Sequence, residues 1–209
     1  MKNMSYQKDF IDVVCSELTN KKISTTNKNI LIKFCENFLE FHDDELEPPS
    51  SMISLLTSSC GNKYPQVISN TINCFGFKHF CFEDMAKFLI DDYENYKIWP
   101  GFGHPKYKNE DPRVKSCLDF MNGVQYQVFY VSKILSLQSK TKHPLNIGGL
   151  FTAFLLDVGF TEKNISYFPI IIRCIGITKI YQKSNNIKFQ SSYEVIKEFN
   201  STHCNWIKL

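Results

Sequence analysis

Apolar residues recur at helical spacing through nearly the whole chain, and this pattern constrains the fold more than any other feature. Phe10, Val13 and Val14 share one stripe of a helix expected over 8–18. Further helical stretches are expected at about 27–41, 66–77, 83–96, 114–137, 148–158, 168–181 and 193–198, with a helix start at 48–51. Period-2 alternation typical of strands is scarce. We therefore predict an all-α fold.

Composition and charge exclude several classes of protein. The 209 residues are 43% apolar, which is enough to build a sizeable core and too apolar for a disordered chain. The net charge of +3 comes from scattered basic residues, so nucleic-acid binding is not expected. Among the 24 Lys and Arg residues only Arg113 and Arg173 are arginines. We interpret both as positions that need a planar, bidentate donor.

Cysteine usage and the apolar runs indicate a soluble, reduced protein. The eight cysteines form no C-x-x-C pair and lie mostly in apolar runs, which favours buried free thiols over disulfides. No spacing of His, Cys and carboxylates indicates a metal site. The N-terminus has no apolar leader, and the longest apolar run, 168–177, is about half a membrane span and carries an arginine. We expect a cytoplasmic location, no membrane partner and no metal.

The least helical stretch, 98–112, holds three of the eight prolines and two of the nine glycines. A structured loop of this length inside a helical protein is usually functional. It contains Gly101-Phe102-Gly103-His104-Pro105-Lys106-Tyr107-Lys108 and leads into Asp111-Pro112-Arg113. This order resembles the G-F-G-H-x-x-Y-K-x-x-D-P-R signature of the citrate synthase superfamily. The proline after the histidine is similar to the short, citryl-CoA lyase-like branch.

Other segments extend the resemblance over about 44–193. Residues 143–149 followed by 155–160 resemble N-V-D-G…L-L-x-D-L-G-F, and 168–176 resembles F-x-x-A-R-x-x-G. Residues 49–61 resemble P-S-S…A-S-T-G, and His79 lies where the family has G-x-x-H-G-G-A. The resemblance implies a citrate synthase-like helical fold. It implies a large lobe from 1–79 and 144–209 and a small lobe from 80–143, which lies on the CoA side in the family.

The family makes or breaks a carbon–carbon bond between a CoA thioester and a keto acid. The resemblance implies that His79 stabilises the enol, that His104 polarises the keto group, and that Arg113 and Arg173 bind carboxylates. It also assigns substrate contacts to Asn146 and Lys188 and CoA contacts to Gly101, Phe102, Gly103, Lys106 and Lys108. A CoA thioester substrate, a small carboxylate ligand and a homodimer follow from it. The alternative for each arginine is an ion pair at a helix end.

Several positions depart from the family pattern. The general base of N-V-D-G is Gly148 here, and Phe80-Cys81-Phe82 replace Gly-Gly-Ala. D-H-G is replaced at 44–46, and Lys188 stands in for an arginine. Glu83 or Asp84 would be a replacement acid, although acids in a first helical turn usually complement the helix dipole. Asp157 resembles a structural position.

Two functions remain open. One is an acyltransferase or lyase of the citrate synthase type with an altered mechanism, acting on a CoA thioester and a small di- or tricarboxylic acid. The other is an inactive homologue that binds carboxylate or CoA as a regulatory partner. The retained histidines and arginines favour the first, whereas Gly148 and the bulky replacements at 80–82 favour the second. The intact 101–113 loop argues against a helical protein without a ligand.

Overall fold

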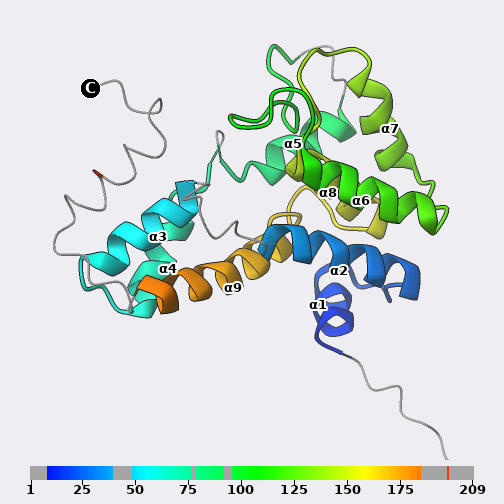
Figure 1. Ribbon diagram of the computed structural model, residues 1–209. Helices are drawn as coiled ribbons and strands as arrows, with labels where there is room; N and C mark the ends of the chain where they lie inside the picture. Colours follow the sequence, from blue (N-terminus) through cyan, green and yellow to red (C-terminus); the bar gives the residue numbers. More distant parts are fainter. Residues whose placement is uncertain (1–8, 40–48, 77–78, 92–95, 185–196, 198–209) are drawn as a thin grey trace, which may run out of the picture. The chain divides into compact units, whose positions relative to one another are not determined.

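The structure is a computed structural model that describes residues 9–39, 49–76, 79–91, 96–184 and 197. In this part of the chain every regular element is an α-helix, and strand pairing is limited to isolated bridges between Gly76 and His79 and between Phe102 and Leu145. The helices are α1 (Phe10–Thr19), α2 (Thr25–Leu39), α3 (Pro49–Ser59), α4 (Tyr64–Ile72), α5 (Phe82–Ile90), α6 (Pro112–Gly123), α7 (Phe129–Gln138), α8 (Ile147–Val158) and α9 (Tyr167–Ser184) (Figure 1). The prediction of an all-α fold is confirmed.

The chain divides into two compact units, each built from two stretches of sequence. The described residues up to Asn37, together with Cys81–Pro169, form the first unit. The described residues of Phe38–Phe80 and those from Ile170 onward form the second unit. The lobes that the resemblance implies, 1–79 with 144–209 and 80–143, stay a prediction. Within the first unit, α8 packs against α5 and α7.

Helix α8 is the centre of the first unit. Ten of its twelve residues are buried, because apolar side chains surround the helix on nearly all sides. The Phe151 ring stacks on Phe34 of α2 with 4.5 Å between centroids, and it meets Phe82 of α5 edge-on at 6.1 Å. Phe168 contacts the same ring edge-on at 6.4 Å. Aromatic packing around Phe151 therefore joins segments that are far apart in sequence.

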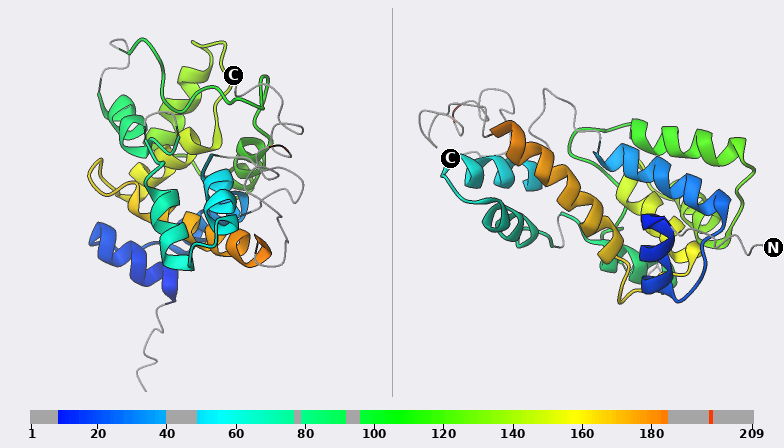
Figure 2. Two further views of the ribbon diagram at one scale, coloured as in Figure 1. Left: turned by 90° about the vertical axis from the view of Figure 1, so that its left-hand side faces the viewer. Right: turned by 90° about the horizontal axis from the view of Figure 1, so that it is seen from below.

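The second unit joins α3 and α4 to the part of α9 that begins at Ile170 (Figure 2). Ser54 of α3 and Thr71 of α4 share a buried hydrogen bond of 2.9 Å. The rings of Tyr64 in α4 and Tyr181 in α9 lie 5.4 Å apart, and the hydroxyl of Ser58 is hydrogen-bonded to that of Ser184. Buried hydroxyls with partners keep these helices together without an unsatisfied polar group at these positions.

The single helix expected over 114–137 is wrong, because the chain forms α6 and α7 there. Gly123 ends α6, and Gln125 in the connection has a positive φ of 53°, which a helix does not tolerate. Asp157 then accepts hydrogen bonds from the backbone N–H groups of Tyr130 and Val131, both at 2.9 Å. This carboxylate of α8 satisfies two free donors at the start of α7, so Asp157 has the structural role expected from the sequence.

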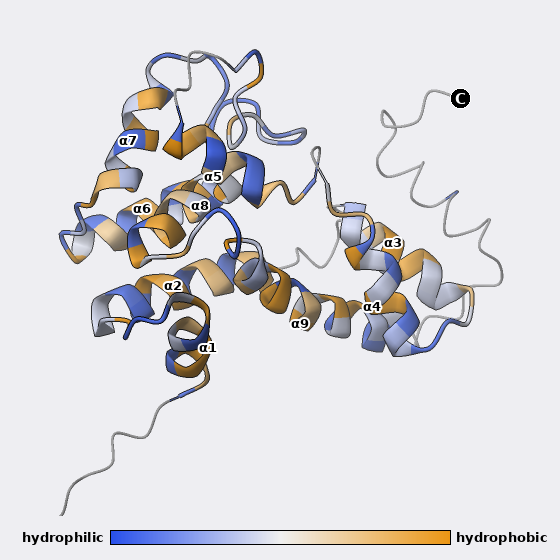
Figure 3. Cartoon of the chain, turned by 180° about the vertical axis from the view of Figure 1, so that it is seen from behind, coloured by the Kyte–Doolittle hydropathy of each residue, from blue (hydrophilic) through white to orange (hydrophobic). Residues whose placement is uncertain are grey.

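Helices of both units carry apolar and polar residues on different sides, as the hydropathy colours show (Figure 3). No helix among the described residues is long and apolar enough to cross a membrane. The seven cysteines in this part of the chain are free thiols. Cys15 and Cys117 are buried as expected, whereas Cys60 is exposed. The eighth, Cys204, lies outside the described residues.

The aromatic packing around α8 predicts a large stability difference between two phenylalanines. Phe151→Ala should lower the free energy of unfolding by about 3–5 kcal/mol, since it removes a fully buried ring and leaves a cavity. Phe129→Ala removes the same atoms from a side chain that is 69% exposed and should cost less than about 1 kcal/mol. Urea unfolding followed by circular dichroism measures both. Equal losses would contradict the central place of α8.

Candidate active site

The 101–113 loop lies against the start of α8 through direct backbone contact. Gly101 has a φ of +89°, and a Cβ at Gly149 would lie 2.6 Å from the Gly101 carbonyl oxygen. Only glycine fits such an approach. The Gly103 N–H donates to the Pro144 carbonyl at 2.6 Å, and the Asn146 N–H donates to the Gly101 carbonyl at 2.9 Å. The loop is therefore a fixed platform and not a mobile connection.

Asn146 joins the loop to α8 through both groups of its amide. Its Oδ1 accepts from the Gly149 N–H at 3.0 Å and caps the helix, while its Nδ2 donates to the Gly103 carbonyl at 2.9 Å. Asparagine is a preferred N-cap residue for this reason. We expected Asn146 to contact substrate, and that contact stays a prediction. The contacts inside the chain give Asn146 a role in holding the loop.

Asp111 is the buried link between α6, α8 and Arg113. Its side chain is fully buried and caps α6 by accepting from the Arg113 N–H at 3.0 Å. Its two oxygens also accept from Arg113 Nε at 2.9 Å and Nη2 at 2.8 Å, and from the Ile147 N–H at 3.1 Å. A buried carboxylate needs such partners, because its desolvation is otherwise costly. This role of Asp111 was not predicted from the sequence, although an aspartate directly before Pro112 is a helix-start signal.

His104 is held in one neutral form by the turn that follows it. Its Nδ1 accepts from the backbone N–H groups of Lys106 at 3.2 Å and Tyr107 at 3.4 Å, and its ring stacks on Tyr107 at 4.7 Å. Burial, reinforced by the nearby Arg113 guanidinium, lowers the pKa of His104 to about 4. Since Nδ1 accepts, the proton of the neutral ring lies on Nε2. His104 therefore offers a single N–H donor to an oxygen atom.

Arg113 lies beside this histidine and keeps part of its guanidinium available. Its Cζ lies 5.2 Å from the centre of the Tyr107 ring, and its side chain is 26% exposed. Asp111 takes the Nε and Nη2 edge, which corresponds to the ion pair considered as the alternative. The Nη1 side is not used by that pair. The structure thus gathers His104, Tyr107 and Arg113 into one cluster in the first unit.

His79 and Arg173 belong to the second unit. The Nε2 of His79 is buried and has no hydrogen-bond partner among the described residues. Burial, with the Arg173 charge as a smaller cause, lowers the pKa of His79 to about 4. Arg173 is 8% exposed, and its Cζ lies 5.8 Å from the ring centres of both Phe38 and Phe80. A neutral histidine and a guanidinium therefore share an aromatic environment.

Phe80, Cys81 and Phe82, which replace Gly-Gly-Ala, lie in different environments. Phe80 adopts a φ of +70°, a strained conformation for an aromatic residue, and stacks on Phe75 at 4.1 Å. Phe82 is 2% exposed and belongs to the core around Phe151, so its ring is not available to fill a ligand site. Burial raises the pKa of the Cys81 thiol to about 11, which keeps it protonated at neutral pH.

The remaining candidates occupy varied positions. Phe102 packs edge-on against Trp99 at 5.9 Å and Phe88 at 6.3 Å, so its ring supports the loop. Lys106 and Lys108 are exposed, as a contact to a CoA phosphate would require. Glu83 and Asp84 lie in the first turn of α5, the position expected of helix-dipole partners. Lys188 lies outside the described residues.

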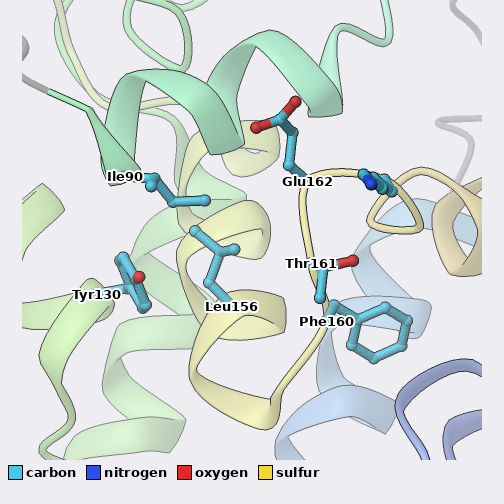
Figure 4. A pocket seen from close by; sticks show the side chains of 7 residues that line it. Ile90, Tyr130, Leu156, Phe160, Thr161 and Glu162 are labelled. Carbon is cyan, nitrogen blue, oxygen red and sulfur yellow. The ribbon is translucent and has the colours of Figure 1, made fainter.

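Two hollows among the described residues do not coincide with this cluster. One of about 510 Å³ lies in the first unit, where the side chains of Ile90, Tyr130 and Leu156 gather opposite Thr161 and Glu162 (Figure 4). The other, of about 290 Å³, is lined by residues between Asn122 and Gln127. Neither contains a residue that the sequence singled out for chemistry. Within the described ranges, no group of three or more His, Cys, Asp and Glu residues is placed to hold a metal ion.

Comparisons with known proteins identify the fold. No family model matches the chain. The mitochondrial 2-methylcitrate synthase of Yarrowia lipolytica is 28% identical over a stretch that covers 46% of this chain and 23% of that protein, so the match spans under a quarter of its length. Citryl-CoA lyase from Hydrogenobacter thermophilus superposes with a TM-score of 0.70 at 21% identity, covering 86% of this chain and 77% of the lyase.

A second solved structure agrees with the first. It is the Methanosaeta concilii ATP citrate lyase, a D541A mutant in complex with (3S)-citryl-CoA, with a TM-score of 0.61 at 13% identity. The matched region covers 86% of this chain and 36% of that lyase. The chain has a citrate synthase-like helical fold, as the motifs predicted.

The backbone contact between the loop and α8 predicts that Gly149 tolerates no side chain. Gly149→Ala should lower the free energy of unfolding by about 3 kcal/mol or more, because its Cβ would meet backbone atoms of Gly101 that cannot move independently. Gly123→Ala, which meets nothing within 4 Å, is the matched control and should stay within about 0.5 kcal/mol of wild type. Chemical unfolding measures both. A tolerated Gly149→Ala would contradict the contact.

The two half-buried histidines, His79 and His104, predict a loss of stability in mild acid. Each has a pKa of about 4 in the folded chain against an ordinary value of 6.5. Between these values the unfolded chain binds more protons, so the free energy of unfolding falls as the pH falls from about 6.5 to about 4. Urea midpoints across this window should decline less steeply in His79→Gln/His104→Gln. His143→Gln, at an exposed histidine, should keep the wild-type slope, and a flat wild-type profile would contradict the assignment.

Proposed function

We propose that this chain binds a CoA thioester together with a small di- or tricarboxylic acid and carries out citrate synthase-type carbon–carbon bond formation or cleavage by an altered mechanism. The observation that carries the proposal is the His104 cluster. A neutral imidazole with its only proton on Nε2 lies beside an arginine that is partly exposed. This combination suits a keto acid, whose carbonyl oxygen accepts from Nε2 while its carboxylate meets the guanidinium.

The distribution of charged and neutral groups in the His104 cluster supports the binding of a keto acid. An anion near Arg113 gains from the guanidinium, and the neutral His104 adds a donor without adding a second positive charge. Because Asp111 fixes the Nε and Nη2 edge, the arginine is oriented before any ligand arrives. Such preorganisation favours charge that develops on a keto oxygen during bond formation or cleavage. In the second unit His79 and Arg173 offer the same pair of chemical groups.

The named relatives support the choice of ligands. One is a 2-methylcitrate synthase, another a citryl-CoA lyase, and the third is an ATP citrate lyase seen with (3S)-citryl-CoA. We carry the CoA thioester and the carboxylate over to this chain on that likeness. We also propose a homodimer, which the resemblance of the motifs implies, and a cytoplasmic location. Light scattering tests the oligomeric state, and a monomer at micromolar concentration would contradict the dimer.

The altered mechanism follows from Gly148. Glycine has no group that takes a proton, and loss of a general base typically costs about 10²–10⁴-fold in rate. We therefore expect little condensation of acetyl-CoA with oxaloacetate. Cleavage by another proton route and thioester hydrolysis remain compatible with the histidines. The second candidate function, an inactive carboxylate- or CoA-binding partner protein, is favoured by the same glycine.

Ligand binding tests the proposal and separates specific contacts from general attraction of anions. Calorimetry with oxaloacetate and citrate should give saturable binding, and Arg113→Lys with Arg173→Lys should weaken it by about 10-fold or more, since lysine lacks the bidentate fork. Lys115→Ala, which removes a cation from the exposed side of the same helix as Arg113, should leave the affinity within about twofold.

Turnover assays on the same preparations separate the two functions. Cleavage of citryl-CoA, or any turnover of a CoA thioester that depends on His104, supports the enzyme. Saturable binding without turnover supports the binding protein. Absence of binding for CoA, acetyl-CoA, oxaloacetate and citrate at millimolar concentration would overturn both functions.

A further inference from the structure

We propose that Met85 occupies the space in which a side chain at position 148 would lie, and so keeps a carboxylate out of that position. A Cβ added at Gly148 would lie 3.2 Å from Met85 Cε and 3.5 Å from Met85 Sδ. The first distance is tighter than most Cβ contacts, so the end of the Met85 side chain would have to move by a few tenths of an ångström. Met85 comes from α5 and Gly148 from α8, two helices that pack against each other in the first unit.

The surrounding contacts hold the methionine in this place. Met85 is 7% exposed, so its side chain is almost wholly enclosed. The hydroxyl oxygen of Thr152 in α8 lies 2.8 Å from the Gly148 carbonyl oxygen and 3.4 Å from Met85 Sδ, so it can donate a hydrogen bond to either. A threonine one turn after Gly148 therefore touches both members of the pair. The flexible, polarizable methionine side chain suits an irregular gap of this kind.

A carboxylate at position 148 would also meet unfavourable chemistry. The Cβ would lie 3.3 Å from Asn146 Oδ1, an oxygen that already accepts from the Gly149 N–H and is fixed by that bond. Oxygen and thioether neighbours donate no hydrogen bond to a carboxylate. Gly148 is half-buried, so a carboxylate there would lose part of its hydration without gaining donors from these neighbours. The dipole of α8 favours an acid in its first turn, so the crowding by Met85 is the obstacle. Because of this crowding, restoring the acid alone does not restore a base.

This inference rests on the proposed function for its chemical meaning, because the resemblance is what places a base at 148. The packing claim stands on the contacts between α5 and α8 alone. If the packing claim and the proposed function both hold, Met85 places a thioether at the point where proton removal would need a carboxylate. Substrates that require removal of a proton beside the thioester are then bound and left unchanged at that carbon.

A double-mutant cycle on the full chain tests the packing claim. Gly148→Asp should lower Tm by roughly 5 °C, and Met85→Ala by roughly 5–10 °C. Gly148→Asp/Met85→Ala should lose several degrees less than the sum, because the shortened side chain makes room. Met121→Ala, at another buried methionine in the first unit, is the control and should combine additively with Gly148→Asp. Additive behaviour with Met85→Ala would overturn the proposal.

Hydrogen exchange at acetyl-CoA adds the chemical readout. In D₂O with oxaloacetate present, the new carboxylate would take a proton from the carbon beside the thioester and return a solvent deuteron to it. NMR should show exchange at least about 10²-fold faster in Gly148→Asp/Met85→Ala than in either single variant. Equal exchange in Gly148→Asp alone would overturn the proposal. Non-additive stability with no exchange in any variant would support the packing claim and contradict the placement of the base position at 148.

Discussion

The backbone contact between Gly101 and Gly149 is the constraint on which the candidate site of the first unit depends. Neither residue leaves room for a Cβ, so the loop reaches α8 only because both are glycine. Asn146 and Asp111 then fix the two parts of the loop to the first turn of the helix. Because the N–H groups of Asn146, Ile147 and Gly149 are paired with the loop or with the Asn146 side chain, the loop cannot shift without leaving polar groups unpaired. The position of His104 follows from this frame.

One carboxylate connects this frame to the chemistry. Asp111 caps α6, meets the start of α8 and orients Arg113, so a single buried charge serves both folding and the proposed ligand site. His104 lies in the same loop with its acceptor nitrogen occupied by backbone N–H groups. The first unit therefore presents a hydrogen-bond donor and a guanidinium. At position 148, by contrast, the protein presents the thioether of Met85 and no base.

The features that could be predicted from the sequence are those that depend on neighbouring residues, such as the helices, and on the loop motif. The helices follow from apolar spacing, and the 98–112 loop follows from its prolines and glycines. The break inside 114–137 was missed, because it depends on the positive φ of Gln125 and on Asp157 reaching across to α7. The filling of the space at Gly148 by Met85 could not be predicted either, since it depends on how α5 packs on α8. The division into two units also depends on how helices that are distant in sequence pack against one another.

The most direct measurement of the central claim is the protonation state of His104 with and without ligand. Nitrogen-15 NMR of labelled histidine at pH 7 should show Nδ1 unprotonated and Nε2 protonated, because backbone N–H groups point at Nδ1. Oxaloacetate should shift the Nε2 resonance in a saturable way, and Arg113→Lys should raise the oxaloacetate concentration at which that shift saturates. A ring that is doubly protonated at pH 7, a proton on Nδ1, or an Nε2 resonance that ignores the ligand would contradict the account.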